Sequence, residues 1–221
     1  MDPGKFPAYQ DYWKQRALLA AQSPHFPVIT WWADEGLSES EQKIFDAVRG
    51  ARHLLDVGAG DHRIRKKIER AGFSGTYHTQ DVSGEHAHTF TDLSQATAGT
   101  YEAVLCLDVL EHLTLENGLA LLGRMRELLK PGGVLVLQTP NARCVRNPLG
   151  WDMTHLHCYN AHDLWAFLVA LGFDASGFRV VFRPKSRTLL DWMLYLSGCW
   201  VTTRILGCDF ADNLLFVARK T

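Results

Sequence analysis

A pair of glycines and a distant acid form the residue pattern with the clearest chemical meaning in this chain. An apolar run breaks at Gly58, Ala59 and Gly60. Such a break predicts a buried strand that turns into a helix, where the backbone can approach a ligand closely. Asp81 closes a second strand-like run, and an acid about 20 residues beyond such a turn can accept hydrogen bonds from two ribose hydroxyls. The pattern predicts a nucleoside site, although the glycines could merely make a tight turn and Asp81 could merely cap one.

The residues after the second glycine indicate which nucleoside fits. A pyrophosphate would lie on the N-terminus of the following helix, but Asp61 stands there and would repel it. Asp61 can instead cap free N–H groups of that helix. The dinucleotide fingerprint also needs a third glycine where this chain has Arg63. A nicotinamide or flavin dinucleotide, and with it a nicotinamide-dependent oxidoreductase, is therefore disfavoured, and a nucleoside without phosphate fits better.

A second group of reactive side chains lies in residues 152–159, in a loop predicted to cover the carboxyl ends of the strands, where ligands bind. His155 and His157 would point the same way in an extended chain, and an imidazole exchanges its proton near neutral pH. We interpret them as a proton acceptor or as groups that orient a substrate, with structural hydrogen bonds as the competing interpretation. A metal cluster with Asp152 or Cys158 is disfavoured because the spacing matches no closed zinc pattern, so no metal is expected.

Polar residues beside this loop are weaker candidates. Asn141, Arg143 and Asp152 could orient a substrate, although loop residues of this type often only make turns. Glu111 and His112 begin the turn after a predicted strand. They could support the site from behind, and capping is an equally good interpretation.

The rest of the sequence predicts the elements that position these residues. Ser38 followed by Glu41 is a capping box that opens a helix to about Arg49. Beyond it strands and helices alternate, which predicts a mostly parallel sheet with helices on both faces. We expect strands at 53–57, 76–80, 103–107, 134–138, 178–182 and 214–218, a short strand near Phe90, and helices at 62–71, 115–129 and 161–171.

The N-terminal residues 1–36 lie outside this alternation. They are rich in aromatic side chains and proline, and we interpret them as an accessory segment, irregular around one short helix, on a domain of residues 37–221. Tyr9, Tyr12 and Trp13 could line the substrate pocket or close over the nucleoside, unless they only pack in the core.

Residues 189–206 are mostly apolar but are interrupted by polar residues. A membrane-spanning helix needs about 20 apolar residues, so spanning is not expected. We expect a packed helix pair or a dimer surface in this insertion, with a lid that rests on a membrane or covers a lipid substrate as the alternative.

Composition excludes several classes of protein. At 221 residues the chain is long enough for one domain with a sizeable core. A formal net charge of −1 gives no broad attraction to nucleic acid. The five cysteines include no Cys-x-x-Cys pair, which argues against a disulfide framework. Without an apolar leader at the N-terminus, a cytoplasmic protein is expected.

Five ordered segments of the chain together resemble the motif series of class I S-adenosylmethionine-dependent methyltransferases. They are Asp56-Val57-Gly58-Ala59-Gly60, Gln80-Asp81-Val82-Ser83, Asp92-Leu93, Leu107-Asp108-Val109-Leu110-Glu111-His112-Leu113 and Leu129-Lys130-Pro131-Gly132-Gly133. The resemblance spans most of the chain. It departs from the family pattern at His62, which replaces a usual glycine, and in the short stretch from Asp81 to Asp92, which leaves little room for a helix.

The resemblance implies an α/β, Rossmann-like fold with a doubly wound, mostly parallel seven-stranded sheet whose last strand is antiparallel. It implies S-adenosylmethionine as the methyl donor and S-adenosylhomocysteine as the product. The implied donor contacts are Asp56, Gly58, Ala59, Gly60, Asp81, Val82, Asp92, Leu93 and Leu107. Asp92 and Leu93 would meet the adenine, and a helix cap is the alternative for Asp92.

The resulting hypothesis is a methyltransferase for a small-molecule acceptor such as a natural product, a sugar or a quinone-like compound. O-methylation is favoured because a histidine base suits a hydroxyl acceptor. N-methylation and a regulatory module that binds the donor without catalysis are the alternatives. We expect no nucleic-acid partner, no membrane span and a monomer or homodimer.

Overall fold

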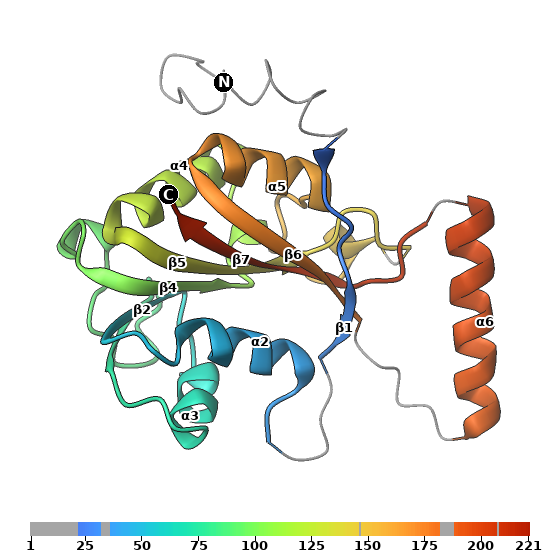
Figure 1. Ribbon diagram of the computed structural model, residues 1–221, viewed down its shortest axis with the longest axis horizontal. Coiled ribbons are helices and arrows are strands. Elements are labelled where there is room, and N and C mark those ends of the chain that lie inside the picture. Colours follow the sequence, from blue (N-terminus) through green and yellow to red (C-terminus); the bar gives the residue numbers. More distant parts are fainter. Residues whose placement is uncertain (1–21, 32–35, 146, 182–187, 207) are drawn as a thin grey trace.

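The computed structural model describes residues 22–31, 36–145, 147–181, 188–206 and 208–221. Its centre is a seven-stranded sheet in the order β1-β6-β7-β5-β4-β2-β3 (Figure 1). The strands are β1 (Val28–Thr30), β2 (His53–Val57), β3 (Thr76–Gln80), β4 (Tyr101–Leu107), β5 (Leu129–Pro140), β6 (Phe173–Val181) and β7 (Asn213–Lys220). The last strand, β7, runs antiparallel to β5 and β6, and the other neighbours are parallel. The predicted fold class is therefore confirmed.

Helices cover both faces of the sheet. Helices α2 (Glu39–Val48) and α3 (Arg63–Arg70) lie on one face, and α4 (Leu115–Leu128) and α5 (Ala161–Ala170) lie on the other (Figure 1). Each layer buries its own apolar cluster, around Ile44 and Ile68 on one side and around Leu122 and Phe167 on the other. The carboxyl ends of the parallel strands are thereby held in one rigid edge, where ligands bind in folds of this kind.

The helix that precedes the glycine turn begins where the sequence predicts. Ser38 Oγ accepts a hydrogen bond from the Glu41 N–H at 3.2 Å, and the Glu41 carboxylate accepts from the Ser38 N–H at 2.9 Å. This reciprocal capping box satisfies two N–H groups that would otherwise be unbonded at the start of α2.

The edges of the sheet differ from the prediction. Residues 28–30, predicted to be irregular, form β1 and pair parallel with β6. This strand is anchored by Phe26, whose ring packs at 5.9 Å from the ring of Phe216. At the opposite edge the predicted strand near Phe90 is only an isolated bridge to Gln80, because few residues connect it to the next element. The domain boundary at residue 36 stays a prediction, and Tyr9, Tyr12, Trp13 and the helix expected around them lie outside the described residues.

Four strands, β4 to β7, are also longer than predicted, and β5 and β6 differ most. β6 begins at Phe173 rather than near residue 178, because it pairs with β7 as far as Lys220. β5 begins at Leu129, directly after α4, and includes Pro131. Pairing with neighbours, not the local sequence, sets these ends.

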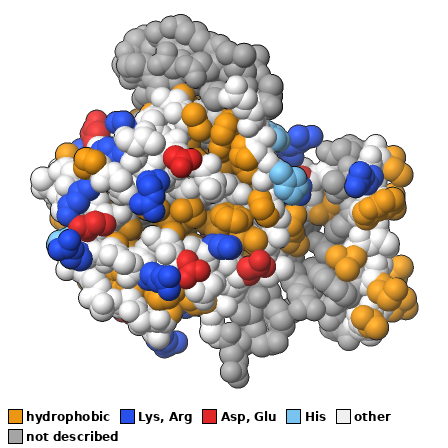
Figure 2. Space-filling model, viewed as in Figure 1, with side chains coloured by type: hydrophobic (Ala, Val, Ile, Leu, Met, Phe, Trp, Pro, Cys, Tyr) orange, Lys and Arg blue, Asp and Glu red, His pale blue; other side chains and the backbone are white. Residues whose placement is uncertain are grey.

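The apolar insertion forms one continuous helix, α6 (Leu189–Leu206), not the expected helix pair. The chain continues helically through Gly198, since a single glycine weakens a helix without ending it. α6 stands beside the edge of the sheet (Figure 1), and hydrophobic side chains are visible on its surface (Figure 2). Its exposed large apolar residues are Leu189, Leu190, Met193, Leu194, Leu196, Trp200, Val201 and Ile205. Within the described ranges, no helix combines the length and apolar character needed to cross a bilayer.

Candidate functional site

The glycine turn after β2 is held against the end of β3. The N–H groups of Gly58 and Ala59 donate to the carbonyl oxygen of Gln80 at 2.8 and 3.1 Å. Gly58 has a φ of +73°, and a Cβ atom there would lie 2.3 Å from Cγ2 of Val109. Gly58 is therefore required both by its left-handed backbone and by close packing against the turn after β4.

Asp81 lies directly beside this turn. Its Oδ2 accepts from the Gly60 N–H at 2.9 Å and its Oδ1 accepts from the Ser83 N–H at 2.8 Å. Each carboxylate oxygen has a further lone pair, so these bonds orient the carboxylate without saturating it. The next side chain, Val82, is 89 % exposed. The structure thus brings Asp81 to the glycine turn, while its ribose role stays a prediction.

The start of α3 confirms the capping role expected for Asp61. Its Oδ1 accepts a hydrogen bond from the Arg63 N–H at 3.0 Å. Between them His62 takes a φ of +60°, the left-handed conformation that glycine adopts most easily. The residue that replaces the usual glycine of the family therefore keeps the glycine-like backbone.

An open cavity of about 440 Å³ lies at the glycine turn, within the usual size range of small-molecule sites. Its charged lining consists of Glu41, Asp56, Asp61, Asp108 and Arg63. Glu41 is already paired with Lys67, while Asp61 and Asp108 form no ion pair in the described part of the chain, so the lining disfavours a pyrophosphate and suits a ligand that carries positive charge.

Asp56 lies in the floor of the cavity and is almost fully buried. Burial raises the pKa of its carboxyl group to about 7, although the hydrogen bond from the Tyr77 hydroxyl at 2.7 Å opposes the shift. The folded protein therefore favours the protonated form of Asp56 at mildly acidic pH.

This shift predicts a pH-dependent stability. Because the folded pKa is above the unfolded value of about 4, Asp56 costs nothing at low pH and increasingly destabilises the fold as the pH rises from about 4 to about 7. The difference in unfolding free energy between Asp56→Asn and wild type should therefore grow by roughly 2–3 kcal/mol, in favour of the variant, as the pH is raised from 5 to 7.5. Urea unfolding of both proteins at the two pH values measures this, with the exposed Asp46→Asn as control. Parallel pH curves would contradict the assignment.

A polar network at the ends of β4, β5 and β7 was not foreseen from the sequence. The Asp108 carboxylate accepts from Nε2 of Gln138 at 3.0 and 3.1 Å and from Nδ2 of Asn213 at 3.1 Å. Asp108 has a φ of +55°, which is strained for a non-glycine residue. Desolvation by the surrounding protein raises the pKa of its carboxyl group. The network fixes this acid at the cavity, next to Leu107, which also lines it.

The residues expected at the adenine lie farther along the same edge. Asp92 is exposed and caps a short 3-10 helix, Leu93–Gln95, by accepting from the Ser94 N–H at 2.6 Å. Leu93 is partly buried against the core. Capping, the alternative interpretation of Asp92, is thus present, and adenine binding by these two residues stays a prediction.

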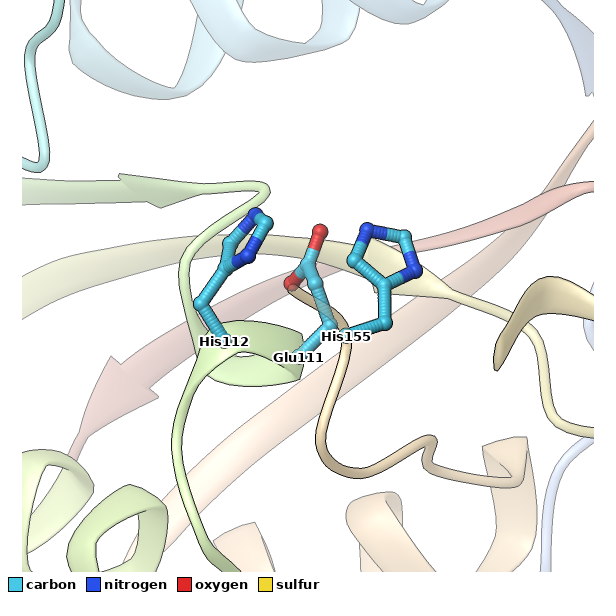
Figure 3. A group of neighbouring side chains, drawn as sticks. All are labelled: Glu111, His112 and His155. Atoms are coloured by element: carbon cyan, nitrogen blue, oxygen red, sulfur yellow. The ribbon is translucent and has the colours of Figure 1, made fainter. Parts of the chain in front are cut away.

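The structure also brings Glu111, His112 and His155 together (Figure 3). Atoms of the three side chains that could bind a metal lie within 4.8 Å of one another. The rings of His112 and His155 are 4.9 Å apart, edge to face. The loop that carries His155 is tied to Glu111, because the backbone carbonyl of Glu111 accepts from the Leu156 and His157 N–H groups at 2.7 and 3.2 Å.

Glu111 is buried in this cluster. Its carboxylate accepts from Thr139 Oγ1 at 3.2 Å, and in the described part of the chain it forms no ion pair. Burial, with the nearby Asp108, raises the pKa of Glu111 to about 8. Glu111, His112 and His155 do not line that cavity themselves, but Asp108, which does, lies near enough to interact electrostatically with all three.

The other candidates on the acceptor side lie apart from this cluster or behind it. The ring of His157 packs edge to face on Tyr159 at 4.7 Å, and burial lowers its pKa. Asn141 is buried, and its amide donates to Asp209 and to the Ala211 carbonyl, which is a structural arrangement. Asp152 is exposed and accepts from Thr154, which in turn contacts His112.

The sequence did not predict that Glu111 and His112 would meet His155, since only their separate positions at strand ends could be recognised.

Comparison with known proteins identifies the family. Residues 31–176 match the family described as methyltransferase domain. The chain belongs to this family. It has the class I methyltransferase arrangement, and a structure of a SAM dependent methyltransferase from Archaeoglobus fulgidus shares its fold with a TM-score of 0.63, at 16 % identity over 93 % of this chain and 94 % of that one.

Curated relatives match over a shorter region. A protein named ubiquinone biosynthesis O-methyltransferase from Xanthomonas campestris pv. campestris (strain B100) is 32 % identical over 111 residues, 43 % of this chain and 45 % of the relative. A protein of the same name from Psychrobacter cryohalolentis is 26 % identical over 161 residues, 62 % of this chain and 60 % of the relative. The chain spans about half the length of these relatives.

Proposed function

We propose that this protein is an S-adenosylmethionine-dependent methyltransferase that methylates a hydroxyl group of a small molecule. The observation that carries the proposal is the acid-lined cavity at the glycine turn, with Asp81 oriented beside it. S-Adenosylmethionine carries a sulfonium, an ammonium and a carboxylate group and no phosphate, so its net positive charge fits a lining in which carboxyl groups outnumber the guanidinium of Arg63. The names of the curated relatives favour oxygen as the acceptor atom.

On the donor side, the free lone pairs of Asp81 would accept from the two ribose hydroxyls. The exposed Val82 would cover the adenine, with Asp92 and Leu93 at its edge. A Cβ atom added at Gly60 would meet no atom of the described residues within 4 Å, so there is open space beside the glycine turn. We place the donor in this space, close to the backbone of Gly58 to Gly60. When bound, the donor supplies a methyl group on a positively charged sulfur.

On the acceptor side, we place the substrate hydroxyl beside Glu111, His112 and His155, next to Asp108 at the cavity. Methyl transfer is an in-line displacement, so these residues act mainly by holding the oxygen at attack distance. The hydroxyl must also lose its proton as the new carbon–oxygen bond forms. The three side chains are the polar groups best placed to promote that loss. Tyr9, Tyr12 and Trp13, with Asp152, remain proposed substrate contacts.

Calorimetric titration and a transfer assay test this function together. S-Adenosylhomocysteine should bind one site per chain, and NAD⁺ should not bind. With S-adenosylmethionine, a panel of small hydroxyl and amine compounds should give methylated products on oxygen, detected by mass spectrometry. Absence of S-adenosylhomocysteine binding would overturn the proposal. Binding without transfer to any acceptor would favour the regulatory module, and products on nitrogen would favour an N-methyltransferase.

A cytoplasmic location and a monomeric or homodimeric state belong to the same proposal.

A further inference from the structure

We propose that Glu111, His112 and His155 form a binding site for one divalent first-row transition-metal ion. Two imidazoles and one carboxylate are a common ligand set for Zn²⁺, Mn²⁺, Fe²⁺ and Co²⁺, with positions left open for a substrate or water. The site itself is inferred from these residues, and its catalytic role rests on the proposed function.

The tautomer of His155 leaves one ring nitrogen ready to bind a metal. Its Nδ1 lies 2.8 Å from the carbonyl oxygen of Pro148, which can only accept a hydrogen bond. Nδ1 therefore carries the proton, and Nε2 carries the lone pair. A backbone carbonyl that holds the second nitrogen of a histidine is the usual support of a metal ligand.

His112 is fixed in the same tautomer by a different partner. Thr154 Oγ1 lies 2.7 Å from Asp152 Oδ1 and 2.8 Å from Nδ1 of His112. The hydroxyl has one hydrogen and donates it to the carboxylate, so its oxygen accepts from the Nδ1–H of His112. His112 Nε2 is then left with its lone pair. The Asp152 carboxylate therefore orients the His112 ring through the Thr154 hydroxyl. Carboxylates orient metal-bound histidines in a similar way.

The geometry and charge of the cluster also favour a cation. The three ligand atoms lie within 4.8 Å of one another, and the Glu111 carboxylate lies between the two rings (Figure 3). At metal–ligand distances of about 2.0–2.2 Å, ligand atoms of a tetrahedral ion are about 3.4 Å apart, so side-chain movements of about 1 Å would bring the three atoms onto one ion. Glu111 is buried without an ion pair in the described part of the chain, and a buried carboxylate is stabilised by a cation.

At this place the ion would act on the methyl acceptor. A hydroxyl oxygen bound to a divalent cation loses its proton more easily. The proton leaves to solvent, the oxygen forms a bond to the methyl carbon, and the carbon–sulfur bond breaks with its electron pair kept by sulfur. His155 is then a metal ligand, and this replaces its predicted role as a base.

Titration of the metal-free full chain with Co²⁺, followed by its visible absorption, tests the site directly. Wild type should bind one equivalent. Glu111→Gln and His155→Ala should weaken binding at least a hundredfold, and Thr154→Val, which frees His112, should weaken it about tenfold. His53→Gln changes a partly exposed histidine at the amino end of β2, on the opposite edge of the sheet from the cluster, and should change nothing.

Each variant is first checked for S-adenosylhomocysteine binding, which reports a folded donor site independently of the metal. No saturable Co²⁺ binding in wild type, or binding in Glu111→Gln and His155→Ala equal to that of wild type, would overturn the metal site even if methyl transfer occurs.

Chelation should lower O-methylation at least tenfold, and Mn²⁺ or Zn²⁺ should restore it. Full activity of the metal-free protein would overturn the catalytic role of the ion. Absence of methyl transfer altogether would refute the proposed function and leave the Co²⁺ titration decisive for the site.

Discussion

Replacing Asp81 by alanine is expected to raise the dissociation constant for S-adenosylhomocysteine at least a hundredfold. Hydrogen bonds to a charged group contribute about 1.5–3 kcal/mol each, and two ribose hydroxyls would be lost at once. At about 1.4 kcal/mol for each factor of ten, the loss corresponds to two to four orders of magnitude. The effect includes a smaller term, because Asp81 also accepts from the N–H groups of Gly60 and Ser83. Calorimetry on wild type and variant measures it.

Two controls separate binding from folding in this experiment. Asp81→Asn keeps an acceptor and loses the charge, so its dissociation constant should fall between those of wild type and Asp81→Ala. Asp46→Ala removes an exposed acid of α2 and should leave binding unchanged. Thermal unfolding without ligand should show Asp81→Ala still folded. A folded Asp81→Ala protein with the wild-type dissociation constant would rule out the ribose contact.

Gly58→Ala is expected to lower the unfolding free energy by roughly 2–5 kcal/mol. The left-handed backbone costs a non-glycine residue about 1–2 kcal/mol. The added Cβ would lie 2.3 Å from Cγ2 of Val109, a stiff branched side chain, and such overpacking costs about 1–3 kcal/mol more. Urea unfolding measures the loss, and binding of S-adenosylhomocysteine should weaken as well because the turn is displaced.

The structure supplies matched variants for the two parts of this cost. Gly60 also has a positive φ, but a Cβ atom there would meet no atom of the described chain within 4 Å, so Gly60→Ala should cost only about 1–2 kcal/mol. Val109→Ala removes the clashing atom, so the double variant Gly58→Ala/Val109→Ala should be more stable than the sum of the single effects by about 1–3 kcal/mol. Additive effects would show that the two residues are not in contact.

Much of the fold was predictable because local signals agreed with the global arrangement. The capping box at Ser38, the glycine break after β2 and the alternation of periodic segments each define an element independently of its neighbours. The three-residue strand β1 carries no periodic signal, and only its pairing with β6 makes it a strand. The early start of β6 at Phe173 depends in the same way on β7.

The candidate site was predictable in part. The spacing of the glycine turn and Asp81 correctly placed them side by side, since both end neighbouring parallel strands. Glu111 and His155 are far apart in sequence and meet only because the loop after β5 folds over the turn after β4. Nothing in the spacing of His155 and His157 indicated that one ring would contact His112 and the other Tyr159.

The position of β7 has a consequence for synthesis of the protein. β7 is the last strand of the sheet in sequence, yet it lies between β5 and β6. As the chain emerges from the ribosome, β5 and β6 are complete while the slot between them is empty, and each has an edge of free backbone groups. The sheet closes only when residues 213–220 insert. Completion of this domain therefore waits for residues 213–220, and until they insert, the open edges of β5 and β6 are exposed to misassembly.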